Sequence, residues 1–166
     1  LRELLMQNFT RATPEQEMLE FKKDDFRSAE SKLGEDSPSK QDMYYINPSK
    51  NFSEQQQKEI ILGESLHRLK KVKPELYNNI YNKALADKDV SSWLKNSYNI
   101  VKKEQNEKRP YEQWVKSSRL DQLIGAYVLG GNQSSLPTLQ DWDIDKLPYG
   151  SIRPDLENIK QQLATP

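Results

Sequence analysis

Apolar residues recur at helical spacing through the middle of the chain, between residues 53 and 131. Ser53 and Gln56 have the spacing of a capping box, in which each side chain bonds the backbone at the other position and starts a helix. The pattern predicts three successive helices, over residues 53–72, 74–86 and 89–107. Each helix carries apolar side chains on one face, among them Ile60, Leu66, Leu69, Leu76, Ile80, Trp93, Leu94 and Val101.

A second apolar stripe follows Pro110, which restarts the chain with one compact helical turn. The stripe continues to a glycine pair at 130–131, which is expected to end the helix. Prolines and a glycine then predict an irregular tail over residues 132–153, followed by a last helix over 154–164. The apolar positions are Leu120, Leu123, Ile124, Tyr127 and Val128 in the stripe, and Leu156, Ile159 and Leu163 in the last helix.

The N-terminal part of the chain has a weaker apolar pattern. Thr13 and Gln16 form a second capping box, with Pro14 at the first helical position. We expect a helix from there to Leu33, ended by Gly34. Its apolar stripe is thin and needs a partner surface to be stable; it consists of Met18, Leu19, Phe21, Phe26 and Leu33.

Residues 34–52 are rich in serine, proline and asparagine, which predicts a linker. The apolar run 43–46 inside it is either a loop pinned to the core or a docking segment for another subunit. No period-two alternation is long enough to predict a sheet. The expected fold is therefore all-α, with about six helices and two long irregular stretches. The expected organisation is an N-terminal helical arm (1–33), the linker (34–52) and a helical domain (53–166), whose core spans 53–131.

The composition is polar for a compact domain. Of 166 residues, 34% are hydrophobic and 30% are charged, and the mean hydropathy is −0.96. Apolar residues usually approach half of a globular domain. Two explanations fit: part of the chain is extended or poorly ordered, or the domain is an elongated helical piece that completes its core against other protein subunits. We expect both to apply.

The charge balance argues against nucleic acid as the main partner. Lysine and arginine total 25, and aspartate and glutamate also total 25, whereas phosphate binding favours a basic excess. One basic patch remains a possible weak nucleic-acid contact, although cations also complement a helix C-terminus. It consists of Arg68, Lys70, Lys71 and Lys73.

Other features concern location and processing. There is no cysteine, which excludes disulfides and cysteine-bound zinc. No apolar run reaches the roughly 18 residues of a membrane span, and no signal peptide is visible. Because the chain begins with Leu1, we expect a fragment whose N-terminal part is missing.

Each candidate for chemistry has a simpler structural explanation. Glu64 and His67 share a helix face, as in di-iron sites, but such sites need a second histidine and His67 is the only one. Residues 141–145 resemble the start of a calcium loop, yet Lys146 stands where the loop needs glycine. The carboxylates of Glu104, Glu112 and Asp121 are expected to be solvated. No catalytic, cofactor-binding or metal-binding residue is therefore predicted.

The most distinctive block lies between residues 109 and 127. Its aromatic and charged residues predict a helix–helix corner, a structural feature and not an active site. We expect structural or interaction roles for seven side chains: Trp93, Tyr111, Trp114, Arg119, Asp121, Tyr127 and Trp142.

This block resembles a helical segment of the large virion proteins of tailed bacteriophages, over about residues 93–166. The residues that carry the resemblance are Trp93, Tyr98, Arg109, Pro110, Tyr111, Trp114, Ser118, Arg119, Asp121 and Tyr127. The resemblance implies an internal, cargo or tail-associated protein, located in the virion, and it carries over no catalytic residue.

The first functional hypothesis is thus a non-enzymatic structural module of a phage particle, without a cofactor. One alternative is a cytoplasmic helical adaptor that binds a protein partner. A second is an accessory segment of a phage cell-wall-degrading or genome-ejection protein.

Overall fold

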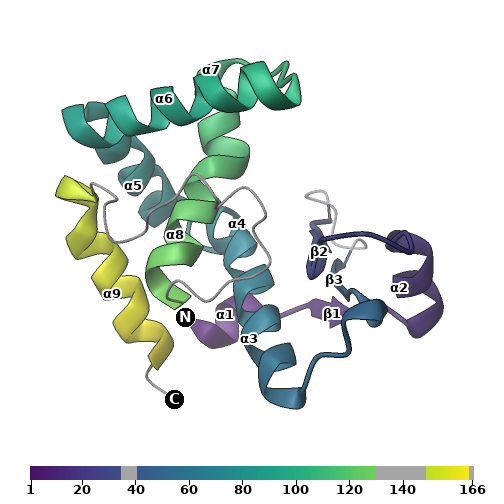
Figure 1. Ribbon diagram of the computed structural model, residues 1–166. Coiled ribbons are helices and arrows are strands. Elements are labelled where there is room, and N and C mark those ends of the chain that lie inside the picture. The colour runs from purple at the N-terminus through teal and green to yellow at the C-terminus, as the bar shows by residue number, and fades with distance from the viewer. Residues whose placement is uncertain (35–40, 130–148, 165–166) are drawn as a thin grey trace. The chain divides into compact units, whose positions relative to one another are not determined.

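The computed structural model describes residues 1–34, 41–129 and 149–164. The described residues form two compact units, one within residues 1–72 and the other within residues 73–166. The boundary between the units follows Val72. The hydrophobic pattern instead predicts one helical core over residues 53–131, so the boundary divides that predicted core. Figure 1 shows the elements of both units.

The first unit contains a three-stranded mixed sheet, so the expectation of an all-α fold is wrong. Its strands are β1 (Phe9–Arg11), β2 (Ala29–Lys32) and β3 (Asp42–Ile46). The central strand β3 runs parallel to β1 and antiparallel to β2. The strands are short, and side chains on both faces of β3 are buried, so no alternation of apolar and polar residues appears in the sequence.

The helix predicted from Thr13 to Leu33 is much shorter in the structure. The capping box of Thr13 and Gln16 is confirmed, with bonds of 2.9 and 3.2 Å. However, α2 (Pro14–Glu20) ends where Phe21 adopts an extended backbone and buries its ring. The predicted linker likewise contains β3, because its apolar residues pair with strands on both sides.

The sheet is covered on both faces, as Figure 1 shows for α2 on one side and α3 on the other. On one face, Phe9, Tyr44 and Ile46 pack against Ile60 and Ile61 of α3 (Glu54–Ser65). The other face forms a smaller cluster of Ala12, Phe21 and Tyr45. Alternate residues of β3 therefore serve two small cores, as the pleat requires.

The chain from Ser53 to Val72 is helical, as predicted. Its capping box is confirmed, since Ser53 and Gln56 bond each other's backbone at 2.9 and 3.2 Å. After α3, a 3₁₀ turn (Leu66–Arg68) leads into α4 (Leu69–Val72), against which α1 (Arg2–Met6) packs. Leu5 and Leu69 are both fully buried.

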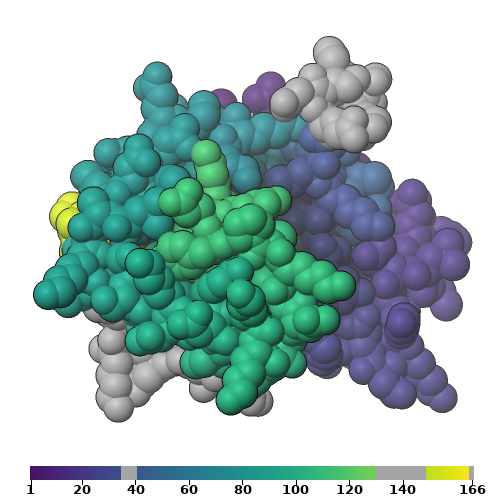
Figure 2. Space-filling model, turned by 90° about the horizontal axis from the view of Figure 1, so that it is seen from above, coloured from purple at the N-terminus to yellow at the C-terminus, as the bar shows by residue number. Residues whose placement is uncertain are grey.

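The regular elements of the second unit, in its described residues, are all helical. It consists of α5 (Pro74–Ala86), α6 (Lys88–Gln105), α7 (Tyr111–Trp114), a π-helical segment (Val115–Arg119), α8 (Leu120–Leu129), a 3₁₀ turn (Gly150–Ile152) and α9 (Arg153–Ala164). Figure 2 shows α6 to α8, in teal and green, as one closely packed surface. Fully buried side chains include Tyr77, Ile80, Leu94, Leu120, Leu123, Ile124, Ile152, Leu156 and Ile159.

Candidate interaction sites

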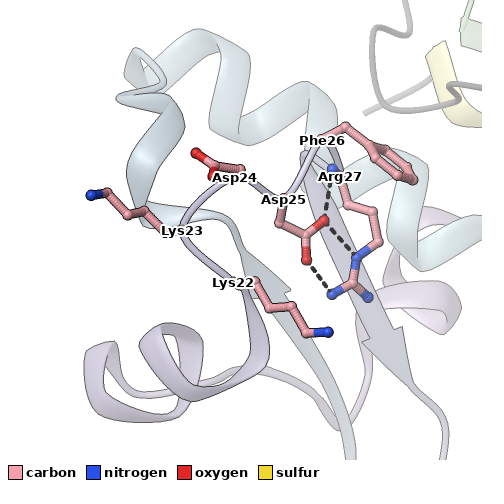
Figure 3. A pocket seen from close by; sticks show the side chains of 6 residues that line it. All are labelled: Lys22, Lys23, Asp24, Asp25, Phe26 and Arg27. Atoms are coloured by element: carbon pink, nitrogen blue, oxygen red, sulfur yellow. Dashed lines mark hydrogen bonds and ion pairs between the residues drawn. The ribbon is translucent and has the colours of Figure 1, made fainter.

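Residues 22–27 form the turn between α2 and β2 and line a shallow hollow (Figure 3). The Arg27 guanidinium donates to both carboxylate oxygens of Asp25, at 3.0 and 2.8 Å, and to Glu30 at 2.8 Å. It also lies over the ring of Phe21, 5.0 Å from its centre. The hydrogen bonds from Arg27 hold the pKa of Asp25 well below its ordinary value. The turn is therefore fixed by charged groups that stay ionised.

Large apolar side chains are exposed on α2 and on this turn. Leu19 is 88% exposed, Met18 70% and Phe26 62%. Lys22 and Lys23 lie between them in the sequence and are also exposed. The sequence predicted that Met18, Leu19 and Phe26 belong to one helical stripe, but Phe26 lies in the turn instead.

A buried ion cluster joins β3 to the 3₁₀ turn and to α4, the two elements that follow α3. Asp42 is 1% exposed and Arg68 5%. The carboxylate of Asp42 accepts bonds from Arg68, from Lys71 at 3.2 Å and from the backbone of Gly34 at 2.6 Å. Burial alone would raise the pKa of Asp42, but these bonds lower it. Arg68 also donates to the carbonyl oxygens of Leu4 and Leu5, which ties α1 to the cluster.

This cluster changes the interpretation of the basic run that follows α3. The sequence grouped Arg68, Lys70, Lys71 and Lys73 as a weak nucleic-acid patch. Arg68 is buried, and both Arg68 and Lys71 bond Asp42. The buried Arg68 is therefore not available to a phosphate group, whereas Lys71 is exposed and shares its charge with Asp42.

Glu64 and His67 lie close together, as their spacing on the helix predicts. The Oε2 atom of Glu64 is 3.9 Å from Nε2 of His67, and the two side chains are 13% and 35% exposed. Burial raises the pKa of Glu64, while the histidine opposes that shift.

In the second unit, the predicted helix–helix corner forms around Arg119. This side chain is 1% exposed. Its guanidinium lies between two indole rings, 5.6 Å from the centre of Trp93 and 5.4 Å from that of Trp114. It donates to Ser97 of α6 and to Gln122 of α8, the latter at 2.9 Å. The ring of Tyr98 contacts both Trp114 and Tyr111, so Tyr111 packs beside the same corner. The corner therefore contains four of the residues for which the sequence predicts a structural role: Trp93, Tyr111, Trp114 and Arg119.

The remaining predicted residues are dispersed. Tyr127 of α8 bonds Glu157 of α9, and its ring meets Tyr149 edge-on at 4.7 Å. Asp121 lies near Tyr77, whose pKa is raised first by burial and then by that carboxylate. Trp142 and the candidate calcium loop at 141–145 lie outside the described residues.

Sequence reasoning missed two features of the first unit. Glu17 is 4% exposed and accepts from the backbone of Ile46 at 2.6 Å, which links α2 to β3. Asp42 was also missed, although an acidic residue directly before the apolar run 43–46 was a usable signal. Neither role is visible without the strand pairing, because their partners are 29 and 26 residues away.

The described residues show neither a membrane-spanning helix nor a metal-binding cluster. None of their helices has both the length and the apolar character needed to cross a membrane. They also contain no cluster of three or more histidine, aspartate or glutamate side chains able to hold one metal ion.

Comparison of the chain with protein families, curated proteins and solved structures gave no match in any of the three.

Proposed function

We propose that this chain is a non-enzymatic interaction module that packs against another protein subunit through the α2 surface. The α2 surface is defined as the exposed side chains of Met18, Leu19, Lys22, Lys23 and Phe26. The observation that carries the proposal is the exposure of its apolar members, of which Leu19 is 88% exposed.

The exposed phenylalanine is held in a preorganised turn. Arg27 bonds Asp25 and Glu30 and also donates to the backbone carbonyl of Glu20 at 3.2 Å. A turn fixed in this way loses little conformational entropy when Phe26 enters a partner's pocket. Aromatic anchors of this kind supply much of the binding energy at protein interfaces.

The charges around the α2 surface suit a partner with an apolar segment bordered by acidic side chains. Three nearby carboxylates already have cationic partners: Asp25 and Glu30 bond Arg27, and Glu20 bonds Lys32 at 2.7 Å. Lys22 and Lys23 are exposed and lie directly after α2. Their charges are therefore placed to pair with acidic groups on the partner.

We further propose that the partner belongs to a bacteriophage particle, which would place this chain in the virion. The resemblance of residues 93–166 to virion proteins of tailed phages supports this context. The corner around Arg119 adds support, because it gathers Trp93, Trp114 and Arg119, three of the residues that carry the resemblance. A cytoplasmic adaptor remains the second candidate, supported by the same α2 surface.

Photo-crosslinking of the full chain in its own cells tests the α2 surface. A photo-reactive phenylalanine derivative at position 26 should give one dominant adduct with another protein, and Leu19→Ser should weaken that adduct severalfold. The same derivative at position 100, where Ile100 of α6 is 38% exposed, is the matched control. Equal adducts from positions 26 and 100 would contradict the proposal.

The virion context has its own measurement. Particles purified by density gradient from cells that produce them should contain the chain at a fixed copy number, together with the crosslinked partner. Adducts found only with soluble cellular proteins, and no chain in the particles, would favour the adaptor.

A further inference from the structure

Exposed charges of opposite sign border the two exposed apolar residues of α2. Glu15 lies three and four residues before Met18 and Leu19, so the three side chains share one face of the helix, and all are exposed. Lys22 and Lys23 are exposed just beyond the last residue of α2, in the turn that Figure 3 shows. From the start of α2 into the turn, the order is therefore acidic, apolar and basic.

The neighbouring charged residues do not cancel this difference between the two ends. In the turn, Asp24 is exposed beside the two lysines, so residues 22–24 still carry a net positive charge. At the start of α2, the Arg11 guanidinium bonds the buried carboxylate of Glu17 at 3.3 Å, and these two charges neutralise each other. Glu15 therefore gives the first end a net negative charge.

Such an order of side chains is complementary to itself when two copies meet in antiparallel orientation. In a two-fold symmetric contact, both copies use the same surface, and if residue i meets residue j, then j also meets i. With Met18 of one copy opposite Leu19 of the second, each Glu15 lies at the level of the other copy's lysine pair. The apolar contacts at the centre are then bordered on both sides by opposite charges, which favours this orientation over a parallel one that would oppose like charges.

The apolar side chains at the centre of this contact are the most exposed of their kind in the described chain. Leu19 is 88% exposed and Met18 70% exposed. Contact between two copies would remove apolar surface of both residues from water, which is favourable. The chain itself thus offers what the α2 surface requires of a partner, an apolar segment bordered by an acidic side chain.

Building on the proposed function of the α2 surface, we propose that the partner subunit is a second copy of this chain. The two copies associate through antiparallel contact of their α2 helices, with Met18 and Leu19 at the centre and Glu15 of each copy beside Lys22 and Lys23 of the other. The surface is small, so the association is weak and depends on concentration.

Analytical ultracentrifugation of the full chain over a series of concentrations tests the association. The wild-type chain should pass from monomer to dimer as its concentration rises. Leu19→Ser should raise the dissociation constant of the dimer by about tenfold or more, because it removes an apolar side chain from the centre of the contact. Ile100→Ser is the matched control, since Ile100 of α6 is also exposed, at 38%, and its replacement should leave the dissociation constant unchanged.

Charge reversal tests the antiparallel orientation. Glu15→Lys alone and Lys22→Glu alone should each weaken the dimer by about fivefold or more at low ionic strength, because each places like charges opposite one another in two symmetric pairs. The two substitutions together exchange the signs of the two ends and restore opposite charges across the contact. The double variant should therefore associate to within about threefold of wild type, a recovery that damage to the fold could not produce.

The dimer and the proposed function fail in different ways. A chain that stays monomeric at every concentration, while a photo-reactive residue at position 26 still crosslinks a different protein, would overturn the dimer and leave the α2 surface as an interaction site. A dimer that Leu19→Ser and Ile100→Ser affect equally would overturn the proposed contact. So would a double charge variant that associates no better than either single variant. A monomeric chain with equal adducts from positions 26 and 100 would contradict both the dimer and the proposed function.

Discussion

At the scale of single residues, Arg119 illustrates how a buried cation can hold several elements together. Its guanidinium stacks between Trp93 and Trp114 and bonds Ser97 and Gln122. A planar guanidinium can stack on aromatic rings while it donates several hydrogen bonds. An ammonium group also donates hydrogen bonds, but it has no flat face that can stack on a ring. The corner should therefore depend on arginine itself and not merely on a positive charge.

Replacement of Arg119 by lysine tests this requirement. We expect Arg119→Lys to lower the free energy of unfolding by about 2 kcal/mol, since it removes the stacking and at least one hydrogen bond. Urea denaturation followed by tryptophan fluorescence measures the change. Arg153→Lys is the matched control, because Arg153 also lies over aromatic rings but is exposed, and its replacement should cost less than about 1 kcal/mol. An equal decrease in the free energy of unfolding in both variants would show that the burial of Arg119 does not add to the stability of the corner.

At the scale of elements, the connection between α6 and α7 is fixed by local polar contacts. Asn106 ends α6 in the left-handed conformation, with φ of 55°. Arg109 then bonds both oxygens of Glu107, at 2.9 and 3.0 Å, and donates to Ser118 at 2.9 Å. These contacts set the direction in which the chain enters α7, and so they help to place Trp114 next to Arg119.

The Glu107–Arg109 pair should make this connection sensitive to acid. The hydrogen bonds from Arg109 lower the pKa of Glu107 from 4.5 to about 2. A carboxyl group with a lowered pKa stabilises the fold above its unfolded pKa, and the contribution is lost as pH falls toward the folded pKa. The stability difference between wild type and Glu107→Gln should therefore shrink between about pH 5 and about pH 2.

Thermal unfolding at a series of pH values measures this difference. Glu104→Gln serves as the control, because Glu104 is an exposed residue of α6. A difference for Glu107→Gln that stays constant across the acid range would contradict the assigned role of the pair.

At the scale of the whole molecule, the two compact units have separate polar centres. Asp42 and its partners Arg68 and Lys71 belong to the first unit. Arg119 and its partners Ser97 and Gln122 belong to the second. Substitutions at sites that share no partner usually have additive effects on stability.

Asp42→Asn is expected to destabilise the chain by about 3 kcal/mol, because it leaves the buried Arg68 without its carboxylate. Combined with Arg119→Lys, the two losses should add to within about 0.5 kcal/mol. A double-mutant cycle by denaturant unfolding tests this. A coupling energy well above about 1 kcal/mol would indicate that the two centres stabilise one cooperative structure.

The sequence alone determined the elements that depend on nearest neighbours along the chain. Both capping boxes, at Thr13 and Ser53, form as predicted, since each involves residues only three positions apart. The helices of the second unit also follow their apolar periodicity, which reports one buried face per helix. The same locality explains why Glu64 and His67 lie together, as a spacing of three on a helix dictates.

Only the tertiary structure decided the sheet and the pairing of distant charges. β1, β2 and β3 are three to five residues long, too short for a strand pattern to emerge, and their stability comes from pairing across the chain. The bonds of Asp42 to Arg68 and of Arg119 to Ser97 join residues 26 and 22 positions apart. Contacts over such separations arise from packing, and local sequence patterns do not encode them.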